Sequence, residues 1–164
     1  MKTAHARLLG NGHRFRIRSG SGHAVTVDNA EGDTGARPAE LLLMALATCT
    51  AMDVISILRK KRQPVDRYEV SVVGEQRSGH PAAFEHIDVE HVVHGAVEPE
   101  ALRRAIELSA TRYCAVSATL SSGVTQIDHR YRLVADGALL EADVCRTGPY
   151  RSPERTELHA ALAG

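Results

Sequence analysis

Residues 38–54 read PAELLLMALATCTAMDV, and this stretch predicts a helix at the centre of a core. Pro38 suits the first turn of a helix, and the carboxylate of Glu40 favours the positive end of the helix dipole. Apolar side chains cover most sides of this helix as far as about Arg62, which is typical of a buried element. Its last residues are basic, and a solvent-exposed helix end is the simplest interpretation of that cluster.

Segments on both sides of this helix show the alternation of β-strands. Asn11-Gly12 predicts a tight hairpin turn between the first two strands, because both residues tolerate a positive φ. The polar segment 29–37 predicts the loop that leads into the helix. The expected strands are 3–9, 13–18, 23–28, 67–77, 83–94 and 124–134, with a second helix at 98–120. This order of elements predicts the α+β class.

Composition limits the kinds of partner that the protein can have. The chain has 164 residues, of which 43% are hydrophobic, and this is enough for one domain that folds without disulfide bonds. The 20 basic and 20 acidic residues cancel, so the net charge gives no support for binding to nucleic acid or to an anionic membrane. The N-terminus lacks the apolar run of a secretory signal, and no segment approaches about 18 uncharged apolar residues. We therefore expect a soluble cytoplasmic protein that binds neither nucleic acid nor a membrane.

Three cysteines are the main candidates for chemistry. Cys49 falls in the middle of the first predicted helix, Cys114 in the middle of the second, and Cys145 in the polar C-terminal segment. A free cysteine is often a small buried hydrophobe, so the residues alone leave an inert role open. A metal site is not expected, because the chain has no Cys-x-x-Cys spacing and because His91 and His94 would point to opposite faces of their strand.

Two of these cysteine contexts resemble segments of a known family. Residues 38–54 resemble the first cysteine segment of the OsmC/Ohr family, the osmotically inducible and organic-hydroperoxide-resistance proteins. Arg112–Val116 resembles the second cysteine segment, and the hairpin expected at 70–93 fits the layout between the two. The resemblance covers residues 5–135 and is greatest to a less characterised OsmC-like branch, which keeps the Cys-Thr-x-x-Asp-Val pattern.

The resemblance implies an OsmC-like domain over residues 1–135. In this fold, an antiparallel sheet wraps around two long central helices in an intertwined homodimer. Residues 136–164 fall outside it and are expected to form a C-terminal appendage, with a helix start at Ser152-Pro153-Glu154. Cys145 in this segment is interpreted as an exposed, incidental thiol, and a second resolving role is the alternative.

The resemblance also implies a cysteine-based thiol peroxidase that reduces alkyl or lipid hydroperoxides in oxidative-stress defence. The Cys49 thiolate would attack the peroxide O–O bond and become a sulfenic acid, and Cys114 would condense with it to a disulfide. An external dithiol or lipoyl-type reductant would restore both thiols, with no cofactor and no metal. The alternative is a non-enzymatic dimer that binds an apolar ligand or senses oxidation through its thiols.

The family activates its cysteine with an arginine held by a glutamate, and this sequence departs from that pattern. Ala39 stands where the glutamate is expected, and Glu40 follows one residue later. Glu40 would share a helix side with Cys49 only if the helix starts late or bends. Arg16, the central one of three alternating strand arginines, is the preferred partner of the thiolate. Asp53 shares the face of Cys49 as a hydrogen-bonding group or a proton acceptor. The catalytic residues predicted in this way are Cys49, Cys114, Glu40 and Arg16.

Overall fold

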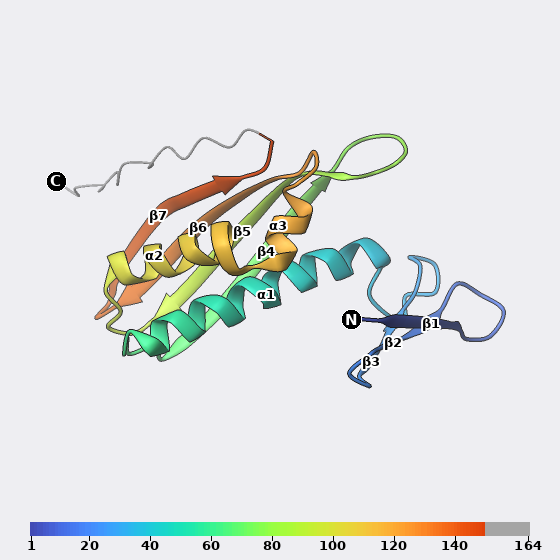
Figure 1. Ribbon diagram of the computed structural model, residues 1–164, viewed down its shortest axis with the longest axis horizontal. Helices are drawn as coiled ribbons and strands as arrows, with labels where there is room; N and C mark the ends of the chain where they lie inside the picture. Colours follow the sequence, from blue (N-terminus) through green and yellow to red (C-terminus); the bar gives the residue numbers. More distant parts are fainter. Residues whose placement is uncertain (150–164) are drawn as a thin grey trace. The chain divides into compact units, whose positions relative to one another are not determined.

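The computed structural model describes residues 1–149, which belong to two compact units (Figure 1). The N-terminal unit comprises Met1–Met44, and the larger unit begins at Ala45. Helix α1 (Pro38–Lys60) contains the boundary between the two. Strands and helices are both present in the order that the sequence predicts, so the α+β class is confirmed.

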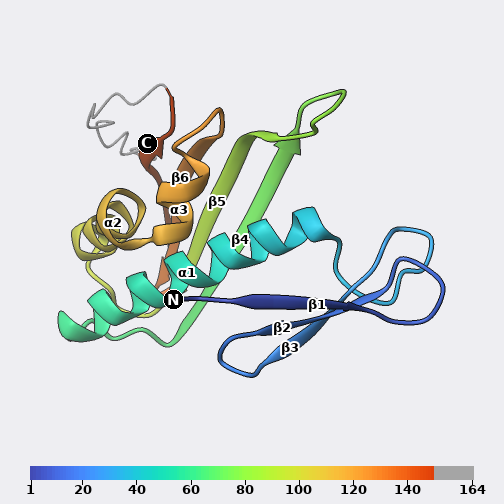
Figure 2. The same ribbon diagram turned by 45° about the vertical axis from the view of Figure 1, so that its right-hand side comes forward.

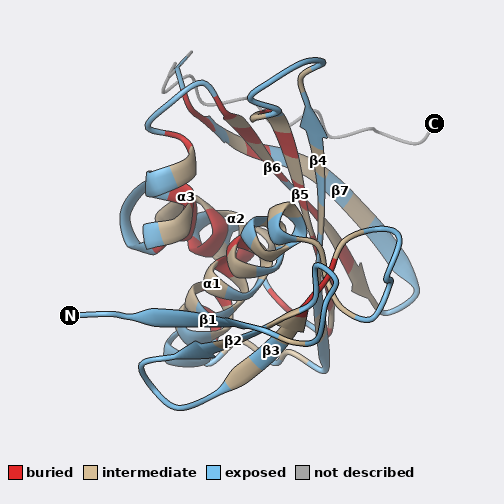
Figure 3. Ribbon diagram, turned by 90° about the vertical axis from the view of Figure 1, so that its right-hand side faces the viewer, coloured by how far each residue is buried: buried red, intermediate tan, exposed pale blue. Residues whose placement is uncertain are grey.

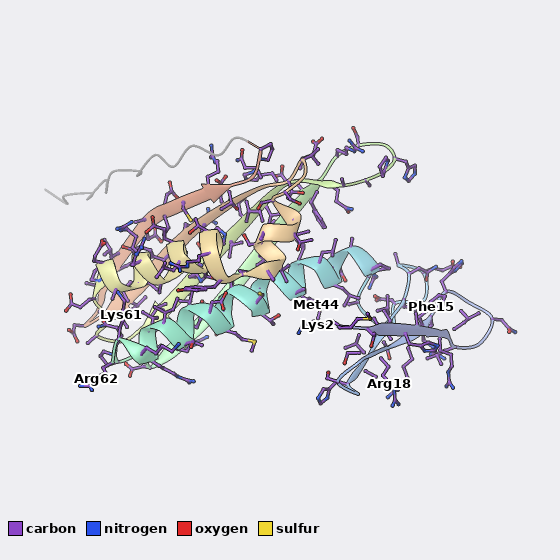
Figure 4. All side chains as sticks on the ribbon, viewed as in Figure 1. Lys2, Phe15, Arg18, Met44, Lys61 and Arg62 are labelled. Carbon is purple, nitrogen blue, oxygen red and sulfur yellow. The ribbon has the colours of Figure 1, made fainter. Side chains whose placement is uncertain are left out.

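The N-terminal unit is a three-stranded antiparallel meander. Its strands are β1 (Ala4–Leu8), β2 (Phe15–Ser19) and β3 (Ala24–Val27), with β2 in the centre. The first hairpin closes with a hydrogen bond of 2.8 Å from the Leu9 N–H to the Arg14 carbonyl. Phe15 and Arg18 mark the two ends of the central strand in Figure 4.

Helix α1 begins and ends with defined hydrogen bonds. Glu40 in its first turn accepts a hydrogen bond of 2.8 Å from the backbone N–H of Arg37, as in one half of a capping box. At the other end Arg62 has a φ of 55°, and the Gln63 N–H donates to the Leu58 carbonyl at 3.0 Å. Figure 4 labels Lys61 and Arg62 just beyond this end of the helix.

Only one side of α1 is fully buried. The buried positions recur every four residues, as one stripe of a helix does, and they are Leu46, Thr50, Val54 and Leu58. Met52 on another side is 72% exposed. Within residues 1–149, α1 is the one helix long and apolar enough to cross a membrane, a property that it shares with the core helices of soluble proteins.

The larger unit contains a four-stranded sheet in the order of the chain. Its strands are β4 (Arg67–Gln76), β5 (Phe84–His94), β6 (Gln126–Ala135) and β7 (Ala138–Thr147). The pairs β4–β5 and β6–β7 are antiparallel, whereas β5 and β6 are parallel. The sheet is therefore mixed and not purely antiparallel as predicted, because a helical crossover connects β5 to β6.

Strand β7 corrects the expectation of a separate appendage from residue 136. Residues Ala138–Thr147 pair with β6 along their length, with Leu140 opposite Leu133. Asp136 and Gly137 between the strands have φ values of 49° and 79°, as a two-residue hairpin turn requires. The Asp-Gly pair was the signal for this turn, and the sequence interpretation missed it. The helix start expected at Ser152-Pro153-Glu154 lies outside the described residues.

The second predicted helix is interrupted near Cys114. It consists of α2 (Pro99–Leu108), the π-helical turn η1 (Ser109–Tyr113) and α3 (Ala115–Leu120). Cys114 has an extended backbone (φ −72°, ψ 103°) and caps α3. The prediction that Cys114 lies in the middle of a continuous helix is therefore wrong. A π turn followed by an extended residue depends on tertiary packing, which helical periodicity does not report.

Helices α2 and α3 cover one face of the sheet (Figures 1 and 2). Figure 3 shows buried residues alternating with less buried ones along β5 and β6, as expected for a sheet with one covered face. The opposite face is polar and carries the ion pairs Arg130–Glu90 and Arg132–Glu141. The core beneath the helices includes Val54, Leu58, Val93, Val97, Leu102, Ala105, Ile106, Tyr131, Leu133 and Val144.

Candidate thiol site

Cys49 and Cys114 lie close together in the larger unit. Their sulfur atoms, together with a carboxylate oxygen of Asp53, all lie within 4.8 Å of one another. Both thiols are free, with Cys49 half-buried and Cys114 buried. A disulfide needs sulfur atoms about 2.05 Å apart, so a short movement of the two side chains would join this pair. The structure thus brings together two of the predicted site residues that are far apart in the sequence.

The carboxylate of Asp53 is the end of a chain of two hydroxyl hydrogen bonds. Ser109 donates a hydrogen bond of 3.1 Å from its Oγ to Oδ2 of Asp53. Ser109 has a single hydroxyl proton, so Thr50, whose Oγ1 lies 3.0 Å from Ser109 Oγ, is the donor in the second hydrogen bond. Thr50 and Ser109 are both fully buried. This chain of hydrogen bonds links α1 to the π turn and fixes Asp53 beside the two sulfurs.

The surroundings of Cys114 keep it protonated. Burial, followed by the hydrogen bond with Cys49, raises the pKa of the Cys114 thiol to about 12. The backbone N–H of Ser117 donates to Cys114 Sγ at 3.3 Å and acts in the opposite direction, but it does not outweigh burial. Cys114 therefore stays in the thiol form at physiological pH.

Arg16 and Glu40 belong to the N-terminal unit. Arg16 is an exposed residue of β2, and Glu40 holds the N-terminus of α1 through the Arg37 N–H. The late helix start that would bring Glu40 to the side of Cys49 is not observed, because α1 begins at Pro38. Activation of Cys49 by Arg16 and Glu40 stays a prediction.

A second polar cluster is buried between the sheet and the helices. Tyr68 Oη is hydrogen-bonded to His91 Nδ1 at 2.8 Å, and the rings of His91 and His129 stack with centroids 5.9 Å apart. Neither nitrogen of the buried His129 ring has a hydrogen-bond partner among the described residues. Burial lowers the pKa of His129 to about 4 and that of His91 well below its usual value. Both rings are therefore neutral at physiological pH.

Sequence reasoning missed Thr50, Ser109 and this histidine pair. The burial of His91 could have been predicted from the alternation of β5, because His91 lies on the same face of the strand as the buried residues Val89 and Val93. Thr50 gave a comparable signal, because it lies on the same four-residue stripe of α1 as Leu46, Val54 and Leu58.

Cys145 is not the exposed tail thiol that the sequence suggested. It lies on β7 opposite His129 and packs against the core cluster. Burial raises the pKa of the Cys145 thiol to about 12. Its position on β7 leaves this thiol half-buried against the core, and the raised pKa keeps it in the thiol form, which is not the form that attacks oxidants.

A half-buried helical cysteine beside a buried cysteine at a helix break, above a mixed sheet, defines an α+β protein with a two-cysteine site. The profile of the OsmC-like protein family matches residues 30–129, and the chain belongs to this family. Protein YhfA of Escherichia coli K12 is 41% identical over 125 residues, which cover 76% of this chain and 92% of YhfA.

Solved structures agree with this assignment. A hypothetical protein from Aquifex aeolicus VF5 superposes with a TM-score of 0.74 at 29% identity, over 83% of this chain and 98% of that one. An organic hydroperoxide resistance protein from Elizabethkingia anophelis shares the fold with a TM-score of 0.60 at 15% identity, over 83% of this chain and 96% of that one. The predicted OsmC/Ohr resemblance and the OsmC-like fold are confirmed.

Proposed function

We propose that the protein is a thiol peroxidase that reduces organic hydroperoxides in oxidative-stress defence. The approach of the Cys49 and Cys114 sulfurs to within 4.8 Å carries this proposal. Membership of a family that includes hydroperoxide-resistance proteins supports it. The half-buried position of Cys49 allows a peroxide to reach its sulfur, while burial keeps Cys114 protonated until the second step.

The first step oxidises Cys49 by two electrons. Its thiolate attacks one peroxide oxygen, the O–O bond breaks, and the alkoxide leaves and takes up a proton to form an alcohol. Cys49 is then a sulfenic acid. In the second step the sulfur of Cys114 bonds to that of Cys49, and the hydroxyl group leaves with the Cys114 proton as water. A dithiol or lipoyl-type reductant exchanges with the disulfide, is itself oxidised to a disulfide, and returns two thiols to the protein.

The working unit in this proposal is a cytoplasmic homodimer without a bound cofactor. One side of α1 is apolar and open, as Met52 shows with 72% of its surface exposed. A second copy of the chain is the occupant proposed for this side, because the resemblance to the OsmC/Ohr family implies an intertwined homodimer built around the long helices. We expect a sedimentation mass of two chains at micromolar concentration, and a single chain would contradict the dimer.

Consumption of cumene and tert-butyl hydroperoxide with a dithiol reductant tests the proposed activity. Cys49→Ser is expected to reduce turnover to the rate without protein. Cys114→Ser should still form a sulfenic acid that dimedone traps, but should lose the intramolecular disulfide. Cys145→Ala is the matched control, because it removes a cysteine outside the pair and should keep turnover.

Two outcomes would contradict this function. Full turnover by Cys49→Ser would exclude Cys49 as the group that attacks the peroxide. Oxidation of the wild-type thiols without repeated turnover would favour the alternative of a protein that only senses oxidants.

A further inference from the structure

We propose that the reduced thiol pair and Asp53 form a binding site for a thiophilic divalent cation such as Zn²⁺. Cys49 Sγ, Cys114 Sγ and a carboxylate oxygen of Asp53 would be the ligands, with a fourth position open to water or an external thiol. This inference goes beyond the proposed peroxidase, because binding does not require turnover. It also departs from the sequence expectation of no metal site, which rested on the absence of Cys-x-x-Cys spacing and on the distance of the histidines from the two thiols.

The ligand distances suit a tetrahedral ion after a small contraction. Zn–S bonds of about 2.3 Å and Zn–O bonds of about 2.0 Å place the ligand atoms about 3.5–3.8 Å apart. The three donor atoms already lie within 4.8 Å of one another without an ion. Rotation about the side-chain bonds of Cys49 and Asp53, which both lie on α1 and are half-buried, can supply the remaining approach.

Hydrogen bonds from buried groups also favour a metal site here, because they already orient two of the proposed ligands. Ser109, which is fully buried, donates to Asp53 Oδ2 and leaves lone pairs on the carboxylate for a cation. Thr50 holds Ser109 in turn. The N–H of Ser117 donates to Cys114 Sγ, which stabilises negative charge on this sulfur. In protein metal sites, the ligand side chains commonly accept or donate hydrogen bonds to groups around them. Three ligand atoms that lie close together by chance need not have such hydrogen bonds.

A second cluster of potential ligands lacks these properties. His86, Asp88 and Asp128 also place ligand atoms within 4.8 Å, on the polar outer face of the sheet. The guanidinium of Arg146 forms an ion pair with Asp128, so a cation there would compete with a positive charge. The thiol site therefore carries the proposal, and the outer cluster does not.

Metal binding and oxidation would exclude each other at this site. Binding of Zn²⁺ releases the two thiol protons and occupies both sulfur lone pairs, which removes the nucleophile. In the metal-free pair, a hydroperoxide accepts the two electrons of disulfide formation and is reduced to an alcohol and water, and the resulting Cys49–Cys114 disulfide no longer offers two thiolate ligands. A bound ion would thus shield the pair from peroxide, and prior oxidation of the pair would prevent the ion from binding.

The test uses Co²⁺ as a spectroscopic probe with the reduced, metal-free, full-length protein. We expect one Co²⁺ per chain, with thiolate-to-cobalt charge-transfer absorption in the near ultraviolet that one equivalent of Zn²⁺ abolishes. Cys49→Ser and Cys114→Ser should lose this absorption. Asp53→Asn should weaken binding about tenfold or more, because an amide oxygen is neutral. Cys145→Ala and Asp66→Asn, which change a cysteine and an acid outside the site, should bind as the wild type does.

Opposite results would overturn the proposal. Absence of charge-transfer absorption in the wild type would exclude the site, and unchanged binding by Asp53→Asn would exclude Asp53 as a ligand. Loss of binding in Cys145→Ala would contradict the proposed ligand set, because Cys145 lies outside it. Peroxide turnover measured on metal-free protein is an independent result, so the metal site and the peroxidase can each fail while the other stands. Circular dichroism of each variant shows whether it is folded.

Discussion

At the scale of single residues, the hydroxyl group of Ser109 is expected to stabilise the contact between α1 and the π turn. Its hydroxyl joins Thr50 and Asp53, and all three lie where α1 meets the π turn. Ser109→Ala leaves the buried Thr50 hydroxyl and one oxygen of Asp53 without this partner. We expect the free energy of unfolding to fall by about 1–3 kcal/mol, because an unsatisfied buried polar group costs this much. Urea denaturation measures the change.

The control for this prediction is Ser122→Ala. Ser122 is exposed and donates only to the Thr119 carbonyl, so its loss should change stability by less than about 0.5 kcal/mol. Combining Ser109→Ala with Thr50→Val gives a double-mutant cycle. Additive effects in that cycle would contradict the hydrogen bond between the two hydroxyls.

At the scale of elements, the start of α1 separates two roles of Glu40. Its carboxylate accepts a hydrogen bond from the Arg37 N–H, and the sequence also predicted that it helps to activate Cys49. Glu40→Gln keeps an acceptor for this N–H but removes the charge, whereas Glu40→Ala removes both. We expect Glu40→Ala to lower the free energy of unfolding by about 0.5–2 kcal/mol, and Glu40→Gln to lower it much less.

Peroxide turnover of the same two variants tests the activating role. If the charge of Glu40 holds the arginine, turnover should fall at least tenfold in both, although only Glu40→Ala loses stability. Wild-type turnover by Glu40→Gln would limit Glu40 to the helix start. Arg16→Lys, which keeps the charge but loses the planar guanidinium, should lower turnover in parallel if Arg16 is the partner.

Most of the helices and strands could be predicted from the sequence, and three features were not. Helix α1 and the strands up to β6 follow from periodicity, and their observed ends lie within a few residues of the predicted ones. The tight turn predicted at Asn11-Gly12 was wrong, because the positive φ in this longer loop falls on Gly10. The break at Cys114 did not follow, because the residues from Ser109 to Tyr113 form a π turn in a segment with helical composition. Strand β7 was missed although Asp136-Gly137 marks its turn, because the segment after Val134 was interpreted as a polar appendage.

At the scale of the whole molecule, the buried histidines make stability depend on pH. His91 and His129 are neutral in the folded protein, and the unfolded chain takes up protons on both below about pH 6.5. The stability that depends on these neutral rings is therefore fully present above about pH 6.5, and it is lost as the pH falls toward about 4, the pKa of His129. We expect the free energy of unfolding to fall by about 1.4 kcal/mol per pH unit for each histidine in this interval.

Urea denaturation between pH 7 and pH 4.5 measures this dependence. His129→Leu should flatten the slope by about 1.4 kcal/mol per pH unit, because it removes one of the two groups. Ser122→Ala, which changes no ionisable group at an exposed position, should leave the slope unchanged. An equal slope in His129→Leu and the wild type would show that the His129 ring does not stay neutral in the folded protein.

The sequence by itself determined the α+β class, the helix that carries Cys49, and the family, because these depend on local periodicity and on motifs within short segments. Only the tertiary structure decided the contents of the thiol site. The Thr50–Ser109 and Ser109–Asp53 hydrogen bonds join residues 59 and 56 positions apart. No local pattern reports such contacts, since they arise when the packed core fixes the distance between α1 and the break at Cys114. The same packing buries His91 and His129 and half-buries Cys145, and so sets which ionisable groups stay neutral.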